Sequence, residues 1–227
     1  MRRHLVLLAC VFFLLQLAAA AAAQQVYWKV QVHQSTDTLQ EEIDQMINDG
    51  YVPMGLAFHE PEFYILYVQT EGLGLTAWSI NRYEDVESLK AGITSKMNDG
   101  YIPSGIAHTG DYLYVLFIET PNTAVAWQMV TAEMNGEAIK ASIQEYASDN
   151  YYPVGITAYG DNYYTLLIKT KTTVIKSWRI GTYAANNEAL VSGINQAIEE
   201  GYIPWGIEVF DDEIDVLYAG LVPYKGE

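Results

Sequence analysis

Carboxylates recur at one position of this sequence, in short polar segments that each lie between two runs of β-forming residues. The segments read His59-Glu60-Pro61-Glu62, Thr109-Gly110-Asp111, Gly160-Asp161-Asn162 and Asp211-Asp212-Glu213. Their oxygen atoms suit a hard cation such as calcium if the segments gather at one end of the fold. Gly-Asp and Asp-rich pairs are also ordinary turn chemistry, and no run matches a known calcium-binding loop. We therefore predict no cofactor, with calcium as the alternative, and solvated turns are the simpler interpretation.

Two histidines offer a second kind of chemistry. His59 and His108 fall one position apart when the repeats described below are aligned on a shared glycine. With Glu60 or Asp111 they could form an acid/base pair or a zinc site on a shared rim. The spacing matches neither HExxH nor HxH, and the sequence has no G-x-S-x-G segment for a serine nucleophile. Ordinary surface histidines are the simpler interpretation.

Aromatic residues are numerous, with 18 tyrosines and 5 tryptophans. Flat aromatic faces beside acids and amides can hold sugar rings, and Trp205 is the best single candidate because Met54, Ser104 and Val154 take its place elsewhere. The alternative is that Trp205 packs against a neighbouring unit. No residue is assigned as catalytic. The candidate ligand-binding residues are Trp205, His59, His108, Glu60, Asp111, Asp161, Asp211 and Asp212.

One unit of about 50 residues repeats four times after residue 23, which is the signature of a repeat architecture. Its clearest part is Gly50-Tyr51-Val52-Pro53-Met54-Gly55, which returns at 100–105, 150–155 and 201–206. Residues that the scaffold needs must recur wherever the scaffold recurs. We therefore interpret the recurring Trp, Tyr, Pro and Gly as structural, serving as core filling, strand start and close backbone approach. Function is expected where the copies differ.

Each unit has the pattern β-α-β-β. In each unit the segment after the first strand carries apolar residues with helical spacing, as in Leu39, Ile43, Met46 and Ile47 of the first unit. The four predicted helices end at Gly50, Gly100, Asn150 and Gly201, whose residue types favour the left-handed conformation after a helix. Plausible N-caps stand at 35–37, 84–85, 135–136 and 186–187. Alternating β-formers predict a strand before the helix and two strands after it.

The predicted fold class is α+β, with one domain at 24–227 made of units at about 24–72, 73–122, 123–172 and 173–227. Few residues separate the third strand of one unit from the first strand of the next, so we expect neighbouring units to adjoin antiparallel. Twelve strands in one open sheet would be unusually wide. We therefore expect the units to curl or close around a pseudo-fourfold axis, with two packed pairs of units as the alternative.

The first residues predict export. Met1-Arg2-Arg3-His4, an apolar run and an alanine tract ending at Ala23 form a signal peptide over residues 1–23, so the mature protein is expected to be secreted or periplasmic. A minor alternative is a lipoprotein anchored at Cys10, because Leu7-Leu8-Ala9-Cys10 resembles a bacterial lipobox. Without residues 1–23 the chain has no cysteine, and no other segment is apolar enough to span a membrane.

The net negative charge of the chain disfavours some classes of binding partner. The full chain has a formal net charge of −16, and losing Arg2 and Arg3 leaves 10 basic residues against 28 acidic ones. Such a surface repels phosphates, so nucleic acid is not expected as a partner. Our first hypothesis is a non-catalytic binding or scaffold module for a glycan, a small ligand or a protein. The alternatives are an extracellular hydrolase or lyase that uses Glu60, Asp111 and Asp161, and a structural or assembly subunit.

Overall fold

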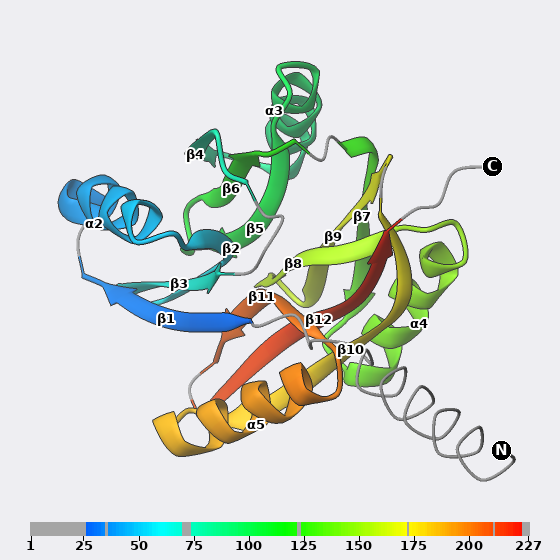
Figure 1. The fold of residues 1–227 in the computed structure, drawn as a ribbon. Helices are drawn as coiled ribbons and strands as arrows, with labels where there is room; N and C mark the ends of the chain where they lie inside the picture. Colours follow the sequence, from blue (N-terminus) through cyan, green and yellow to red (C-terminus); the bar gives the residue numbers. More distant parts are fainter. Residues whose placement is uncertain are drawn as a thin grey trace, which may run out of the picture.

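The computed structural model describes residues 26–34, 36–69, 74–121, 124–171, 173–210 and 212–223, and these residues form four units in a row (Figure 1). Unit 1 has β1 (Tyr27–His33), α2 (Thr36–Asn48), β2 (Val52–His59) and β3 (Glu62–Gln69). Unit 2 has β4 (Ala77–Tyr83), α3 (Val86–Asn98), β5 (Ile102–His108) and β6 (Leu113–Glu119). Unit 3 has β7 (Ala124–Glu133), α4 (Gly136–Ala147), β8 (Tyr152–Tyr159) and β9 (Asn162–Thr170). Unit 4 has β10 (Thr173–Ala184), α5 (Asn187–Glu199), β11 (Ile203–Val209) and β12 (Glu213–Pro223).

The mixed α+β composition and the repeated β-α-β-β unit are therefore confirmed. None of the helices in the described part of the chain combines the length and the apolar character that crossing a membrane requires. The expected signal peptide, with Cys10, lies outside the described residues.

The helix ends follow from local sequence. Gly50, Gly100 and Gly201 have φ of +87°, +95° and +89°, and Asn150 has φ of 63°, so all four predicted helix ends adopt the left-handed conformation. At the other end of the helices, side chains cap α3, α4 and α5 by accepting a hydrogen bond from a backbone N–H three residues on. These caps are Asp85, Asn135 and Asn186. The cap of α2 was predicted at residues 35–37; α2 begins at Thr36, and Ser35 lies outside the described residues.

The cap of α5 allows a direct test. Oδ1 of Asn186 accepts a hydrogen bond from the Ala189 N–H at 2.9 Å, so Asn186→Ala leaves one donor of the helix N-terminus without its partner. We expect a loss of about 1 kcal/mol in the free energy of unfolding, measured by urea denaturation. Asn187→Ala, one residue inside the helix, is the matched control and should change stability by less than about 0.5 kcal/mol. Equal losses in the two variants would show that the cap contributes nothing specific.

The strands form four separate three-stranded antiparallel sheets rather than one sheet or a closed barrel. In every unit the third strand lies in the middle, as in the order β1-β3-β2. The expectation that the third strand adjoins the first strand of the next unit is wrong for this reason. Because β3 already pairs with β1 on one side and β2 on the other, it has no edge left for β4.

A bulge distorts the second strand of every unit. The pairing register shifts between Pro53 and Gly55, and the same shift occurs in β5, β8 and β11. The bulge residues are Met54, Ser104, Val154 and Trp205, and all four are buried. Ser104 donates a hydrogen bond to the Pro53 carbonyl at 3.1 Å, so the bulges of units 1 and 2 touch.

A glycine follows the bulge residue in all four units, and close contact between units explains why. A Cβ on Gly105 would lie 2.5 Å from the Leu56 N atom, and one on Gly155 would lie 2.9 Å from the Ile106 N atom. A Cβ on Gly55 would lie 3.2 Å from the Gly206 Cα atom, so unit 1 also touches unit 4. The predicted close backbone approach is confirmed. In Figure 1 the strands β2, β5, β8 and β11 lie toward the middle of the molecule, and the four labelled helices lie around its outside.

The recurring tryptophans lie between units rather than filling the centre of one. Nε1 of Trp78 in unit 2 donates to Oδ1 of Asp44 in α2 at 2.8 Å, and Nε1 of Trp28 in unit 1 donates to Oδ1 of Asn195 in α5 at 2.9 Å. All four tryptophans are partly exposed. The helix of one unit therefore faces the first strand of another, and several pockets lie at such boundaries.

Candidate functional site

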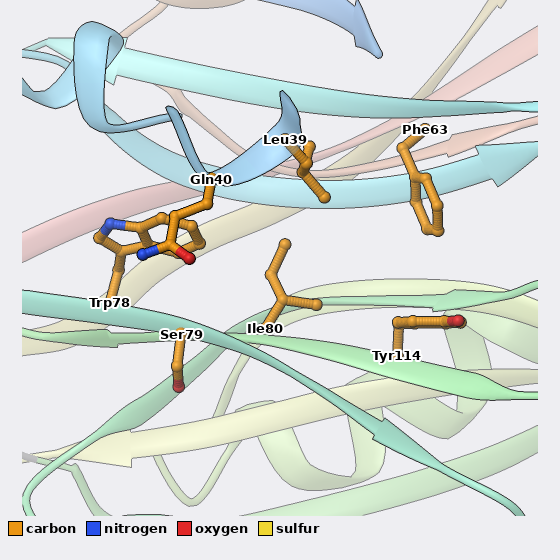
Figure 2. Close-up of a pocket in the computed structure, with 7 residues that line it drawn as sticks. All are labelled: Leu39, Gln40, Phe63, Trp78, Ser79, Ile80 and Tyr114. Atoms are coloured by element: carbon orange, nitrogen blue, oxygen red, sulfur yellow. The ribbon is translucent and has the colours of Figure 1, made fainter. Parts of the chain in front are cut away.

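A pocket of about 380 Å³ lies at the boundary between α2 of unit 1 and β4 of unit 2 (Figure 2). We call it the α2–β4 pocket. Its lining residues are mostly apolar or aromatic: Leu39, Gln40, Phe63, Trp78, Ser79, Ile80 and Tyr114. Leu39 and Phe63 are 7% and 6% exposed, so the floor of the pocket belongs to the core between units 1 and 2. This size and lining are typical of sites that bind small or extended ligands.

β4 forms one wall of the pocket. Three successive residues of this strand line it, although successive side chains of a strand point to opposite faces. Figure 2 shows Ile80 pointing toward Leu39 and Ser79 pointing away from it. The strand therefore reaches the pocket with its backbone as well as with side chains. Within the described residues β4 pairs only with β6, so its other edge keeps N–H and C=O groups that a ligand can bond.

Polar groups in the α2–β4 pocket are few. The Nε1 atom of Trp78 is already bonded to Asp44, and the Ser79 hydroxyl donates to Oδ1 of Asn81 at 3.1 Å. Gln40 lies beside the indole of Trp78 in Figure 2 and is exposed. Because its described lining residues are mostly apolar or aromatic and include neither a carboxylate nor an imidazole, the pocket is suited to hold an apolar group.

The boundary between units 3 and 4 has a pocket in the equivalent place, with a volume of about 320 Å³. We call it the α4–β10 pocket. Its lining residues are Met134, Asn135, Gly136, Ile139, Lys140, Tyr163, Ile180, Thr182, Phe210, Glu213 and Asp215. Ile139 corresponds to Leu39 and Tyr163 to Phe63, but Asp215 stands where the α2–β4 pocket has Tyr114. The two pockets share one scaffold and differ in chemistry.

Two buried carboxyl groups lie side by side at this boundary. Glu208 of β11 and Asp215 of β12 are directly opposite in the register, and they are 5% and 8% exposed. Oε1 of Glu208 accepts from the Ala158 N–H at 3.1 Å and from the Thr157 hydroxyl at 3.4 Å, which links unit 4 to unit 3. Oδ1 of Asp215 accepts from the Thr182 hydroxyl at 2.5 Å. The other oxygen of Glu208, Oε2, is buried without a hydrogen-bond partner.

The environment of these carboxyl groups disfavours ionisation. Burial raises the pKa of Glu208 well above its usual value, against hydrogen bonds from Ala158 and Thr157 and with a further increase from the charge of Asp215. Burial also raises the pKa of Asp215, against the hydrogen bond from Thr182. The nearby phenol responds as well: burial and then the charges of Asp215 and Glu208 raise the pKa of Tyr163 to about 12.

The described hairpin carboxylates of the candidate set line neither pocket. Glu60, Asp111 and Asp161 are exposed and belong to the turns of units 1, 2 and 3, and Asp212 is exposed before β12. Asp211 lies outside the described residues. Among the described residues no group of three or more His, Asp or Glu side chains is placed to hold a metal ion. A calcium site in these turns stays a prediction.

The two candidate histidines lie at the ends of β2 and β5. The ring of His108 packs against Tyr159 of unit 3, with centroids 4.5 Å apart and an interplanar angle of 67°. Its Nε2 atom is buried without a hydrogen-bond partner, and burial lowers the pKa of His108, partly offset by the hydrogen bond with Gly110 and the charge of Asp111. His59 is partly exposed. At neutral pH we therefore expect His108 to be uncharged.

Trp205 occupies the bulge of β11 and is 3% exposed. Its ring meets Tyr152 edge to face at 5.3 Å between centroids. The bulge turns this residue toward the interior, so its ring is covered by the neighbouring unit and has little surface for a ligand.

Sequence reasoning missed the residues that line both pockets. The tryptophans and the apolar helix residues were assigned to the scaffold because they recur. Asp215 was visible as the one residue that replaces a recurring tyrosine, and Glu208 as the one charge where the other units have Ala57, Ala107 and Thr157. Comparing the four copies position by position is the signal that finds these two carboxyl groups.

Comparison with known proteins gives one family. A model described as "Polyglycine hydrolase-like, structural repeat" matches residues 26–57 and 124–167, which are parts of units 1 and 3. These segments are therefore similar to a repeat found in polyglycine hydrolase-like proteins, which supports the internal repeat. No curated protein matches the sequence of the chain.

Proposed function

We propose that this protein is a non-catalytic binding module whose α2–β4 pocket holds an apolar side chain of a peptide extended along the edge of β4. One observation carries the proposal: the pocket has an apolar floor, and β4, which lines it, is an edge strand of its sheet within the described residues. A peptide that adds a strand to such an edge gains main-chain hydrogen bonds, while pockets for alternate side chains supply selectivity.

A peptide fits this pocket better than a sugar does. A sugar ring carries many hydroxyl groups that need partners, whereas among the described lining residues the polar side-chain groups left for a ligand are the Gln40 amide and the Tyr114 hydroxyl. The family match adds support, because its name contains a hydrolase of polyglycine, which is a peptide. The matching segment is described as a structural repeat, so a scaffold that presents a binding site is the role we take from it.

The proposed module is exported and arranged as a ring. Contacts of unit 1 with unit 4, through Gly55 and through Trp28, support an arrangement of the four units around a pseudo-fourfold axis. The signal peptide predicted at residues 1–23 supports secretion or a periplasmic location. Such a ring repeats the helix–strand boundary several times and lets each boundary carry a different ligand group.

Peptides of one length test the proposal. We compare Gly₄-Leu-Gly₄, labelled with fluorescein, with the all-glycine peptide of equal length by fluorescence anisotropy. Burial of one leucine side chain is worth about 1.5–3 kcal/mol, so the leucine peptide should bind roughly 10-fold to 150-fold more tightly. Ile80→Glu should reduce this affinity by about 10-fold or more, because it places a carboxylate against the apolar floor.

Val125→Glu is the matched control, since it also replaces a β-branched apolar residue with glutamate, but on the exposed surface of β7 in unit 3, where Val125 is 47% exposed. It should leave peptide affinity unchanged. Equal binding of the two peptides, or equal loss in both variants, would contradict the proposal. Analysis of the peptides after incubation adds an independent outcome, because cleavage would favour the hydrolase alternative.

A further inference from the structure

The α4–β10 pocket has a carboxyl group in its wall that is itself buried. Asp215 is 8% exposed, lines the pocket and accepts a hydrogen bond from Thr182. The pocket also contains the ring of Tyr163, which meets Phe210 edge to face at 5.7 Å between centroids. Ile139 and Ile180 supply aliphatic wall. The pocket therefore combines a carboxylate with apolar and aromatic surface.

A second carboxyl group stands directly beside the first. Glu208 faces Asp215 across the β11–β12 pair, is 5% exposed and has one oxygen, Oε2, buried without a hydrogen-bond partner. In the described part of the chain neither carboxyl group forms an ion pair with a lysine, arginine or histidine. A buried carboxyl group is normally either protonated or paired with a cation, so a cation bound here would favour the ionised form of the pair.

The charged groups around the pocket leave it negative. Lys140 also lines the pocket, but its Nζ atom is paired with Oε1 of Glu137 on the same helix at 3.1 Å. Glu213 contributes a further carboxylate to the lining. With Glu208 behind Asp215, the acidic groups outnumber the one lysine.

We propose that the α4–β10 pocket binds an organic cation on an aliphatic stem, such as the ammonium group of a lysine side chain in a partner. The ammonium would donate hydrogen bonds to Asp215, and the faces of Tyr163 and Phe210 would add cation–π attraction. Ile139 and Ile180 would cover the methylene groups of the stem. A volume of about 320 Å³ lies within the range of small-ligand sites.

The equivalent α2–β4 pocket serves as an internal comparison. At the positions of Asp215 and Glu208, unit 2 has Tyr114 and Ala107. The scaffold therefore does not need acids at these two places. This inference concerns a second site and holds or fails independently of peptide binding at the α2–β4 pocket.

Small amines test the inference on the whole protein. We expect n-butylammonium chloride to bind in the low millimolar range, about 1–10 mM, measured by NMR chemical-shift titration, and 1-butanol to bind at least about 10-fold more weakly. Asp215→Asn should reduce butylammonium affinity by about 10-fold or more, because the charge partner is lost. Asp111→Asn is the matched control, since it removes an exposed hairpin carboxylate, and it should leave the affinity unchanged.

The pH dependence gives a second readout. Asp215 and Glu208 must be ionised to attract the cation, so butylammonium affinity should rise from about pH 5 to about pH 8. Glu213, Lys140 and Tyr163 also line the pocket, and the phenol of Tyr163, whose pKa is raised to about 12, stays neutral in this range. Binding of 1-butanol as tight as that of butylammonium, equal losses in Asp215→Asn and Asp111→Asn, or no saturable binding by the unsubstituted protein would each overturn the inference.

Discussion

Replacing Gly105 with alanine should lower the free energy of unfolding by about 3 kcal/mol or more. The new Cβ would lie 2.5 Å from the Leu56 N atom and 3.0 Å from the Gly55 carbonyl carbon. Both atoms belong to the backbone of unit 1, which is fixed by pairing with β3 and cannot turn aside as a side chain end does. The two units would have to separate, and the buried bulge residues Met54 and Ser104 would lose contact.

The other glycines give a graded series. Gly155→Ala places its Cβ 2.9 Å from the Ile106 N atom, and Gly55→Ala places it 3.1 Å from the Ile207 N atom, so the loss should decrease in the order Gly105, Gly155, Gly55. Gly136→Ala is the matched control. Its Cβ would meet nothing within 4 Å at the start of α4, and it should be neutral or stabilising by up to about 1 kcal/mol.

Urea denaturation measures the free energy of unfolding of each variant, and the values are comparable when the dependence of this free energy on urea concentration (the m value) is the same for all variants. A Gly105→Ala variant within about 1 kcal/mol of the unsubstituted protein would show that units 1 and 2 do not approach so closely in solution. Loss in all four variants alike would point to a general cost of the substitution instead.

The features that repeat were the ones that could be predicted. Four aligned copies place Gly50, Gly100, Asn150 and Gly201 after an apolar stripe of helical period, and each of these residues is left-handed and lies two or three residues after the last residue of a helix. The glycine after each bulge was expected to allow close backbone approach, and it does. Such local rules depend on a few neighbouring residues, so repetition makes them visible.

The order of strands within a sheet could not be predicted in this way. Short connections indicated that β3 would meet β4, but both edges of β3 are occupied by strands of its own unit. The pairing of β1 with β3 joins residues that lie before and after helix α2 in the sequence, such as Trp28 and Val68. No local sequence signal indicates this pairing. Alternation of apolar residues predicts which side chains of a strand face the core, but it does not specify which strands pair with it.

The pockets lay beyond prediction for a related reason. Each is built from the helix of one unit and a strand of the next, so its residues come together only when the units are assembled. Trp78 was interpreted as structural because tryptophan recurs at this position in all four units, but it also lines a pocket. Asp215 stood out as the one departure from a recurring tyrosine, and its meaning required the burial that only the fold provides.

The two buried carboxyl groups predict an unusual dependence of stability on pH. Burial raises the pKa of both Glu208 and Asp215 in the folded protein above the value in the unfolded chain. Between these values the folded protein keeps a proton that the unfolded chain releases. The contribution of these groups to stability is therefore greatest below the unfolded pKa, falls as the pH rises through the window up to the folded pKa, and stays low above it.

Glu208→Gln should remove much of this decrease in stability with rising pH. The amide oxygen can still accept from the Ala158 N–H, while the cost of burying a charge disappears. We expect the free energy of unfolding at pH 7 to increase by about 1–3 kcal/mol, with little change near pH 4, where the carboxyl group is already protonated in the folded protein. Asp215→Asn should act in the same direction and by less, since Asp215 lies at the pocket wall and keeps its bond from Thr182.

Asp111→Asn, on an exposed turn, should change stability by less than about 0.5 kcal/mol at either pH. Urea unfolding at pH 4 and pH 7, in buffers free of amines, separates these outcomes because a bound cation would itself stabilise the ionised form. A loss of stability at pH 7 in Glu208→Gln would mean that the ionised carboxylate is favoured in the fold. The pair would then need a cation within the protein itself, and the α4–β10 pocket would lose the unmet charge that makes it a site for an organic cation.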